Sequence, residues 1–127
     1  MLAVLIVEDE ADIRDMAAIA LDAAGYQIFT ADGAEPALAI LRDHPDIDLL
    51  VADTRLAGAA SGFGLARAAE RLRPEIKVLY TTARPDELLR LDSPIDPMQV
   101  LRKPYQAAEL QRMVGWLLQA AQDAGGT

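Results

Sequence analysis

Three carboxylates and one lysine are the residues of this chain whose types and spacing could do chemistry. Glu8 and Asp9 follow one short apolar run, Asp53 follows another, and Lys103 comes directly before Pro104. Clustered carboxylates repel one another, and a hard divalent cation such as Mg²⁺, which prefers oxygen ligands, relieves that repulsion. A carboxylate oxygen can also attack an activated phosphoryl group when a metal ion and a lysine balance the charge on the phosphoryl oxygens. These residue types therefore indicate a phosphate-handling site.

The apolar runs before these acids have the pattern of strands that are buried on both faces. Residues 3–7 and 48–53 are short, rich in branched side chains and bounded by polar ones. In an open parallel sheet the carboxyl ends of the strands lie along one edge, and the crevice there is the usual ligand site. We therefore expect Glu8, Asp9 and Asp53 to converge at that edge, although they are far apart in the sequence.

Thr82 ends another predicted strand and could hydrogen-bond a phosphoryl oxygen, so that its movement would report attachment of the group. Each residue taken singly also has an ordinary interpretation. Asp53 could be a turn former or helix cap, Glu8 and Asp9 could be favourable charges at the start of a helix, and Lys103 could be a solvated charge. Their joint placement is the stronger signal, because each one lies at or just beyond the carboxyl end of a predicted strand.

Strands and helices alternate along the rest of the chain. Further strands are predicted at residues 26–31, 76–80 and 98–101, and helical spacing of apolar residues is found over positions 13–24, 34–41, 65–72 and 110–121, with a short helix at 85–91. Gly25 stands where the first helix should end, and Asp32 with Glu35 resembles a capping box that opens the second. Because parallel strands need helical crossovers, the fold class is α/β, a doubly wound parallel sheet of five strands flanked by helices.

Composition limits the domain organisation and the chemistry. The chain has 127 residues with 52% hydrophobic content, enough for one domain, which we place at residues 1–121 with a flexible tail at 122–127. There is no Cys, and His44 is the single His, which excludes thiol chemistry, disulfides and nearly all zinc or copper sites built from Cys and His. The net charge of −8 disfavours direct binding to nucleic acid or anionic membranes. We expect a cytoplasmic protein with protein partners.

The combined pattern resembles a known family. The acidic pair, Asp53, Thr82 followed by Ala83, and Lys103 followed by Pro104 look, in this order and spacing, like the receiver domain of two-component response regulators, over nearly the whole chain. The resemblance implies a flavodoxin-like strand order of 2-1-3-4-5. It also implies that the chain takes a phosphoryl group from a sensor histidine kinase or a phosphotransfer protein and passes the signal to a downstream protein target.

The resemblance further implies a role for each residue of the pattern. Asp53 matches the phosphoacceptor, Thr82 the switch hydroxyl and Lys103 the lysine that contacts the phosphoryl group. Mg²⁺ would be held by Glu8, Asp9, Asp53 and the backbone carbonyl of Arg55. By this resemblance the chain is a phosphoacceptor signalling protein and not an enzyme, although slow self-dephosphorylation is compatible with it.

Two departures from the family pattern matter for signalling. Ala57 replaces a proline that the family usually has after the acceptor, and Val100 replaces an aromatic residue before the lysine. A relay from Thr82 to an aromatic side chain at position 100 is therefore not available. Trp116 projects away from the apolar stripe of the last helix, and we expect this face, with Val100 on the fifth strand, to be an interface for a partner or for a homodimer. The alternative is a tryptophan that lies flat over its neighbours.

Two other functions remain open from the sequence alone. A receiver-like adaptor could keep the site but work without phosphorylation, which the altered acceptor loop and Val100 favour. A Mg²⁺-dependent phosphohydrolase that forms an aspartyl-phosphate would need an acid two residues after Asp53. Arg55 stands there instead, and an arginine that stays charged cannot act as a general acid or base near neutral pH.

Overall fold

Parallel strands alternate with helices along the chain in the computed structural model, which describes residues 1–56, 61–86 and 95–125. The order is β1 (Ala3–Val7), α1 (Ala11–Ala23), β2 (Gln27–Ala31), α2 (Ala34–Asp43), β3 (Ile47–Asp53), α3 (Gly62–Leu72), β4 (Lys77–Thr82), β5 (Val100–Arg102) and α4 (Ala107–Gly125), with a short 3₁₀ helix, η2 (Pro97–Gln99), directly before β5. The five strands form one parallel sheet in the order β2-β1-β3-β4-β5. The predicted fold class and strand order are confirmed.

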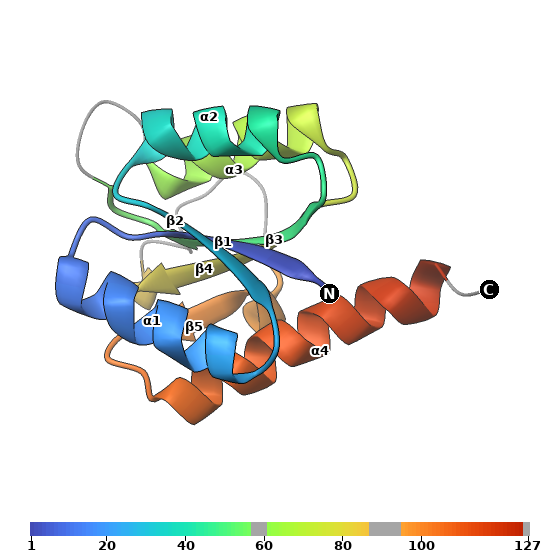
Figure 1. The fold of residues 1–127 in the computed structure, drawn as a ribbon. Coiled ribbons are helices and arrows are strands. Elements are labelled where there is room, and N and C mark those ends of the chain that lie inside the picture. The colour runs from blue at the N-terminus through green and yellow to red at the C-terminus, as the bar shows by residue number, and fades with distance from the viewer. Residues whose placement is uncertain (57–60, 87–94, 126–127) are drawn as a thin grey trace.

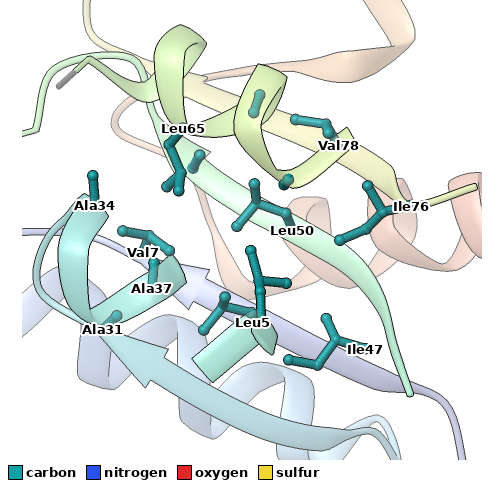
Figure 2. Packing of buried hydrophobic residues seen from close by; sticks show 14 of the residues in the cluster. Leu5, Val7, Ala31, Ala34, Ala37, Ile47, Leu50, Leu65, Ile76 and Val78 are labelled. Carbon is teal, nitrogen blue, oxygen red and sulfur yellow. The ribbon is translucent and has the colours of Figure 1, made fainter. Parts of the chain in front are cut away.

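The sheet lies between two layers of helices. Helices α2 and α3 cover one face, and α1 and α4 cover the other (Figure 1). The alternation of side chains along β1 explains this arrangement, because Leu5 and Val7 belong to the core under α2 and α3, whereas Val4 and Ile6 belong to the core with α1 and α4. Figure 2 shows Leu5 and Leu50 from adjacent strands in one buried cluster with Leu65 of α3. Every residue of β1 is buried, which is the reason that this strand is apolar throughout.

The pairing of β1 with β3 contains one irregularity near its start. Ala3 pairs with Ile47 and Val4 pairs with Leu49, so Asp48 is an extra residue on β3. The carboxylate of Asp48 accepts a hydrogen bond of 2.9 Å from the amide of Ala3, which gives that amide a partner. The predicted strand at 48–53 is thus confirmed, and it begins one residue earlier, at Ile47.

The cap of the second helix and the start of the last strand differ from the sequence predictions. The capping box of Asp32 and Glu35 is wrong, because α2 begins at Ala34 and its N-cap is Gly33, with no side-chain cap. The fifth strand starts at Val100 and not at residue 98, because Asp96 accepts a hydrogen bond of 2.9 Å from the Met98 amide and opens η2.

The last helix also ends later than predicted. Helix α4 runs to Gly125, so the tail that we placed at residues 122–127 begins inside the helix. No glycine or proline interrupts residues 116–124, and a glycine is a common helix-ending residue. The short helix predicted at residues 85–91 lies mostly outside the described residues, as does Ala57. Within the described residues, no helix is long and apolar enough to cross a membrane.

Candidate functional site

Lys103 joins two strand-end acids at the carboxyl edge of the sheet. Its Nζ lies 2.5 Å from Oε1 of Glu8, which follows β1, and 2.7 Å from Oδ2 of Asp53, which ends β3. Glu8 and Asp53 are 3% and 6% exposed, so the contacts between these charged groups are largely shielded from solvent. Lys103 comes from the loop after β5, and its amide donates a hydrogen bond of 2.8 Å to the carbonyl of Thr82 at the end of β4. The structure therefore brings together residues from β1, β3 and β5, as the sequence predicted.

Glu8 is fixed by protein contacts at each of its polar groups. Its amide donates to the carbonyl of Ala31 at 3.1 Å, and its carbonyl accepts from Nη1 of Arg14 at 2.9 Å. Its Oε2 accepts from the amide of Glu10 at 3.2 Å, and Oε1 contacts Lys103. The position of this carboxylate is therefore set by two strands, the β5–α4 loop and helix α1.

The electrostatic state of the site follows from burial. Burial raises the pKa of Glu8 to about 7, and the negative charge of Asp53 acts in the same direction, while hydrogen bonds from Lys103 and the Glu10 amide oppose it. Burial by itself would lower the pKa of Lys103, but hydrogen bonds to Asp53 and Glu8 outweigh burial and raise that pKa above its ordinary value. Lys103 is therefore charged at neutral pH. A single lysine facing two carboxylates leaves an excess of negative charge, which suits a divalent cation.

Asp9 and Glu10 extend the acidic group towards solvent. Carboxylate oxygens of Glu8, Asp9 and Glu10 all lie within 4.8 Å of one another, and both Asp9 and Glu10 are exposed. Glu10 was not among the ligands proposed from the sequence, which placed Asp53 in the group instead. The signal for Glu10 is its position in the same short loop, between the strand end and the first residue of α1.

The carboxylate of Asp53 is held by the backbone that follows it. The amide of Arg55 donates a hydrogen bond of 3.0 Å to Oδ1 of Asp53. The amide of Thr54 donates to the carbonyl of Thr81 at 3.0 Å, and the amide of Gly62 donates to the carbonyl of Thr54 at 3.2 Å. The start of helix α3 is therefore attached directly to the end of β3, and sequence reasoning missed Gly62.

Thr82 lies at the predicted strand end and is buried, 1% exposed. Its Oγ1 accepts a hydrogen bond of 2.9 Å from the amide of Arg84, which fixes the turn after β4. Its carbonyl accepts from the Lys103 amide, so the backbone of Thr82 touches the lysine that bridges the acids. Because Oγ1 accepts in this bond, the hydroxyl proton of Thr82 can donate to another acceptor.

A small apolar cavity adjoins the lysine on the side of α1. It has a volume of about 220 Å³ and is lined by Ile13, Met16, Ala83, Lys103, Pro104 and Tyr105. Burial raises the pKa of Tyr105 to about 12, with a further contribution from the negative charge of Glu8, so this phenol remains protonated beside the acids. The bridging lysine thus has an apolar surface beside it.

The two residues proposed for an interface lie away from the acids. Trp116 is 47% exposed on α4, as predicted. Val100 is half-buried at the start of the edge strand β5, where it pairs with Tyr80 of β4. Tyr80 is buried and its ring lies 5.1 Å from the ring of Phe63 on α3. The core beside Val100 thus contains an aromatic pair contributed by β4 and α3.

Comparisons with known proteins agree with this geometry. The model of the response regulator receiver domain matches residues 4–115. The phosphate regulon transcriptional regulatory protein PhoB of Pseudomonas aeruginosa is 37% identical over 114 residues, which are 84% of this chain and 47% of PhoB. The response regulator receiver protein CpdR of Brucella abortus is 32% identical over 120 residues, which are 93% of this chain and 98% of CpdR. The chain spans about half the length of the first two relatives, 47% and 45%, and nearly all of CpdR.

Solved structures give the same result. A response regulator receiver protein from Sinorhizobium medicae has a TM-score of 0.82 at 25% identity and is covered over 96% of its chain by 94% of this one. The receiver domain of the PhyR response regulator of Erythrobacter litoralis has a TM-score of 0.79 at 28% identity, over 93% of this chain and 90% of that one. The fold and the comparisons define the class of protein, a family of signalling phosphoacceptors. The chain belongs to the receiver domains of two-component response regulators.

Proposed function

We propose that this chain is a single-domain response regulator that accepts a phosphoryl group on Asp53 and thereby changes its affinity for a protein partner. The observation that carries the proposal is the position of Lys103, whose Nζ lies 2.7 Å from Asp53 and 2.5 Å from Glu8. A cation held between an acceptor carboxylate and a second acid is suited to balance the charge of an incoming phosphoryl group. The single-domain form is supported by the match to CpdR, of which this chain covers 98%.

The transfer would form one P–O bond and break one P–N bond. An Asp53 carboxylate oxygen attacks phosphorus of a phosphohistidine on a sensor kinase or phosphotransfer protein, and the bond to the imidazole nitrogen breaks. The electron pair stays with that nitrogen, which takes up a proton. Lys103 balances charge on the phosphoryl oxygens, and the backbone amide of Arg55, which already donates to Oδ1 of Asp53, keeps the carboxylate oriented.

The residues present fit Mg²⁺. Glu8, Asp9, Asp53 and the backbone carbonyl of Arg55 would hold it, a set of oxygen ligands that suits a hard cation, with Glu10 near the same place. When bound, Mg²⁺ supplies positive charge to the phosphoryl oxygens. Burial raises the pKa of Glu8, and a bound cation would favour the charged form of this carboxylate.

Signal output would depend on protein contacts. Phosphorylation adds a charge of about −1.5 to −2, and Thr82 would turn its hydroxyl from the Arg84 amide towards the phosphoryl oxygens. We propose the surface of β5 and α4 around Val100 and Trp116 as the contact for the downstream target or for a homodimer. The net charge of −8 argues against direct binding to nucleic acid. The proposal includes a cytoplasmic location, where the kinase domain of a sensor would meet it.

The test is the intact mass of the protein after incubation with Mg²⁺ and acetyl phosphate. The wild type should gain one phosphoryl group, Asp53→Asn should gain none, and Asp46→Asn, which changes an exposed acid of the turn before β3, should behave like the wild type. If the wild type gains no mass from acetyl phosphate or from a kinase donor, a receiver-like adaptor that works without phosphorylation replaces the proposal. Retained partner binding by Asp53→Asn would favour the same alternative.

A further inference from the structure

The loop that carries the acids contains no side-chain cap of its own. Residues 8–10 connect β1 to α1, and Glu10 is the N-cap of α1 but makes no side-chain hydrogen bond to the helix. A loop that must hold carboxylates at fixed positions around a cation needs some other restraint, because small displacements of ligands weaken binding.

Arg14, in the second turn of α1, supplies that restraint at both ends of the loop. Its amide donates a hydrogen bond of 2.9 Å to the carbonyl of Glu10, and its guanidinium Nη1 donates one of 2.9 Å to the carbonyl of Glu8. Asp9, whose side chain is exposed, lies between these two fixed carbonyls. A hydrogen bond from a charged donor to a carbonyl is stronger than one between neutral groups.

The other described contacts of Glu8 end at its carboxylate or at its own amide, not at its carbonyl. Lys103 and the Glu10 amide hold its carboxylate, and its own amide bonds to Ala31. The plane of the peptide between Glu8 and Asp9 is set by the Glu8 carbonyl, and of the described contacts only the guanidinium of Arg14 reaches that carbonyl. The direction in which Asp9 leaves the strand therefore depends on Arg14.

We propose that Arg14 is a positioning residue for the cation site, which fixes the Glu8–Asp9 peptide so that both carboxylates face the same cation. This inference rests on the proposed function, since it assigns a role towards Mg²⁺. It makes Arg14 part of the site although the residue carries a positive charge and is not a ligand. If Arg14 acted through its charge alone, its removal would reduce repulsion of Mg²⁺ and would tighten binding. A positioning role predicts instead that removal of Arg14 weakens Mg²⁺ binding.

The experiment is a calorimetric titration of Mg²⁺ into the metal-free full chain at pH 8, for the wild type, Arg14→Met, Arg14→Lys and Arg67→Met. Methionine keeps the length of the side chain and removes its donors, while lysine keeps the charge on a single donor nitrogen. Arg67→Met is the control, because Arg67 is exposed on α3. We expect at least fivefold weaker Mg²⁺ binding in Arg14→Met, partial recovery in Arg14→Lys and no change in Arg67→Met. Amide hydrogen exchange at Asp9 and Glu10 in the metal-free protein should be faster in Arg14→Met.

The outcomes separate this inference from the proposed function. Equal or tighter Mg²⁺ binding by Arg14→Met, with the wild type binding normally, overturns the positioning role and leaves the phosphoacceptor proposal intact. A lower unfolding temperature in Arg14→Met with unchanged Mg²⁺ affinity has the same meaning, since it shows a structural contact only. Absence of Mg²⁺ binding by the wild type overturns both. If Arg14→Met does not fold, Arg14→Lys decides, because an ammonium group lacks the planar guanidinium and should still leave Mg²⁺ binding measurably weaker than in the wild type.

Discussion

Gly62 lies directly against the backbone carbonyl of Asp53. A Cβ atom at position 62 would be 2.0 Å from the carbonyl oxygen of Asp53 and 2.8 Å from its carbonyl carbon, distances that no side chain can adopt. Both partners are backbone, so neither can turn aside. The glycine therefore allows the first turn of α3 to touch the end of β3, and it couples the position of that helix to the position of Asp53.

Replacement of this glycine should displace the backbone around Asp53 and destabilise the protein. We expect Gly62→Ala to lower the free energy of unfolding by about 3 kcal/mol or more, because α3 must move away from β3. Gly64→Ala is the matched control, since a Cβ there would meet only the Ser61 side chain, at 3.7 Å. That change should be neutral or stabilising by up to about 1 kcal/mol, as alanine favours a helix. Urea unfolding of both variants measures the difference, and equal stability of the two would contradict the role of Gly62.

The sequence predicted the acids and the lysine because their positions depend on strand patterns. The runs before Glu8 and Asp53 are apolar and short, so their ends could be located, and a parallel sheet brings such ends together. Gly62 and Arg14 were missed for a different reason. Their roles arise from contacts between elements, a close approach in one case and a long side chain reaching back in the other, and neither contact produces a periodic pattern.

Boundary errors had local causes. The spacing of Asp32 and Glu35 fits a capping box, but that motif requires its first residue to be the N-cap, and the chain places Gly33 there. The start of β5 was missed because Asp96 and Pro97 open a turn of 3₁₀ helix, a signal that competes with the apolar character of Met98. In both cases the sequence shows a polar residue near the start of a helix, but it does not show which residue is the N-cap.

The pKa of Glu8 predicts that Mg²⁺ binding depends on pH. With a pKa of about 7 in the metal-free protein, Glu8 holds a proton below neutral pH, and the cation must displace it. We expect the apparent Mg²⁺ affinity to rise from pH 6 to pH 8, with a limiting slope of about tenfold per pH unit below the pKa. Titrations in buffers of different ionisation enthalpy should show proton release at pH 6 and little at pH 8. A constant affinity over this range would contradict the prediction.

The same group should make the stability of the metal-free protein depend on pH. The pKa of Glu8 is raised from 4.5 to about 7 on folding, so the folded state binds this proton more tightly than the unfolded state. The protonated Glu8 therefore contributes to the free energy of unfolding. This contribution is fully present below about pH 4.5 and is lost as the pH rises through about 7. Glu8→Gln keeps the shape without titrating, and its unfolding free energy should change less between pH 5 and pH 8 than that of the wild type. Parallel curves for the two proteins would contradict this assignment.

Removal of Lys103 should leave two acids without their shared cation. We expect Lys103→Met to slow phosphorylation by acetyl phosphate by about 10²-fold, the usual effect of losing one charge-balancing group. The pKa of Glu8 should rise further, because the hydrogen bond from Lys103 currently lowers it. Lys77→Met is the control, since Lys77 begins β4, at the opposite end of the strand from Thr82. Phosphorylation followed by intact mass over time checks the rate, and equal rates for Lys103→Met and the wild type would remove Lys103 from the mechanism.

Substitution of Trp116 tests whether the surface of β5 and α4 binds a partner or a second copy of the chain. The side chain is 47% exposed on α4, so Trp116→Ala should change the free energy of unfolding by less than about 1 kcal/mol. If the surface of β5 and α4 binds a partner or a second copy, association of the phosphorylated protein should weaken by about tenfold or more, as for an aromatic residue at the centre of an interface. Ile19→Ala is the control, because Ile19 is 72% exposed but lies on α1. Sedimentation of the phosphorylated proteins, alone and with a captured partner, measures the association. Equal association of the wild type and both variants would exclude this surface and direct attention to the apolar cavity beside Lys103.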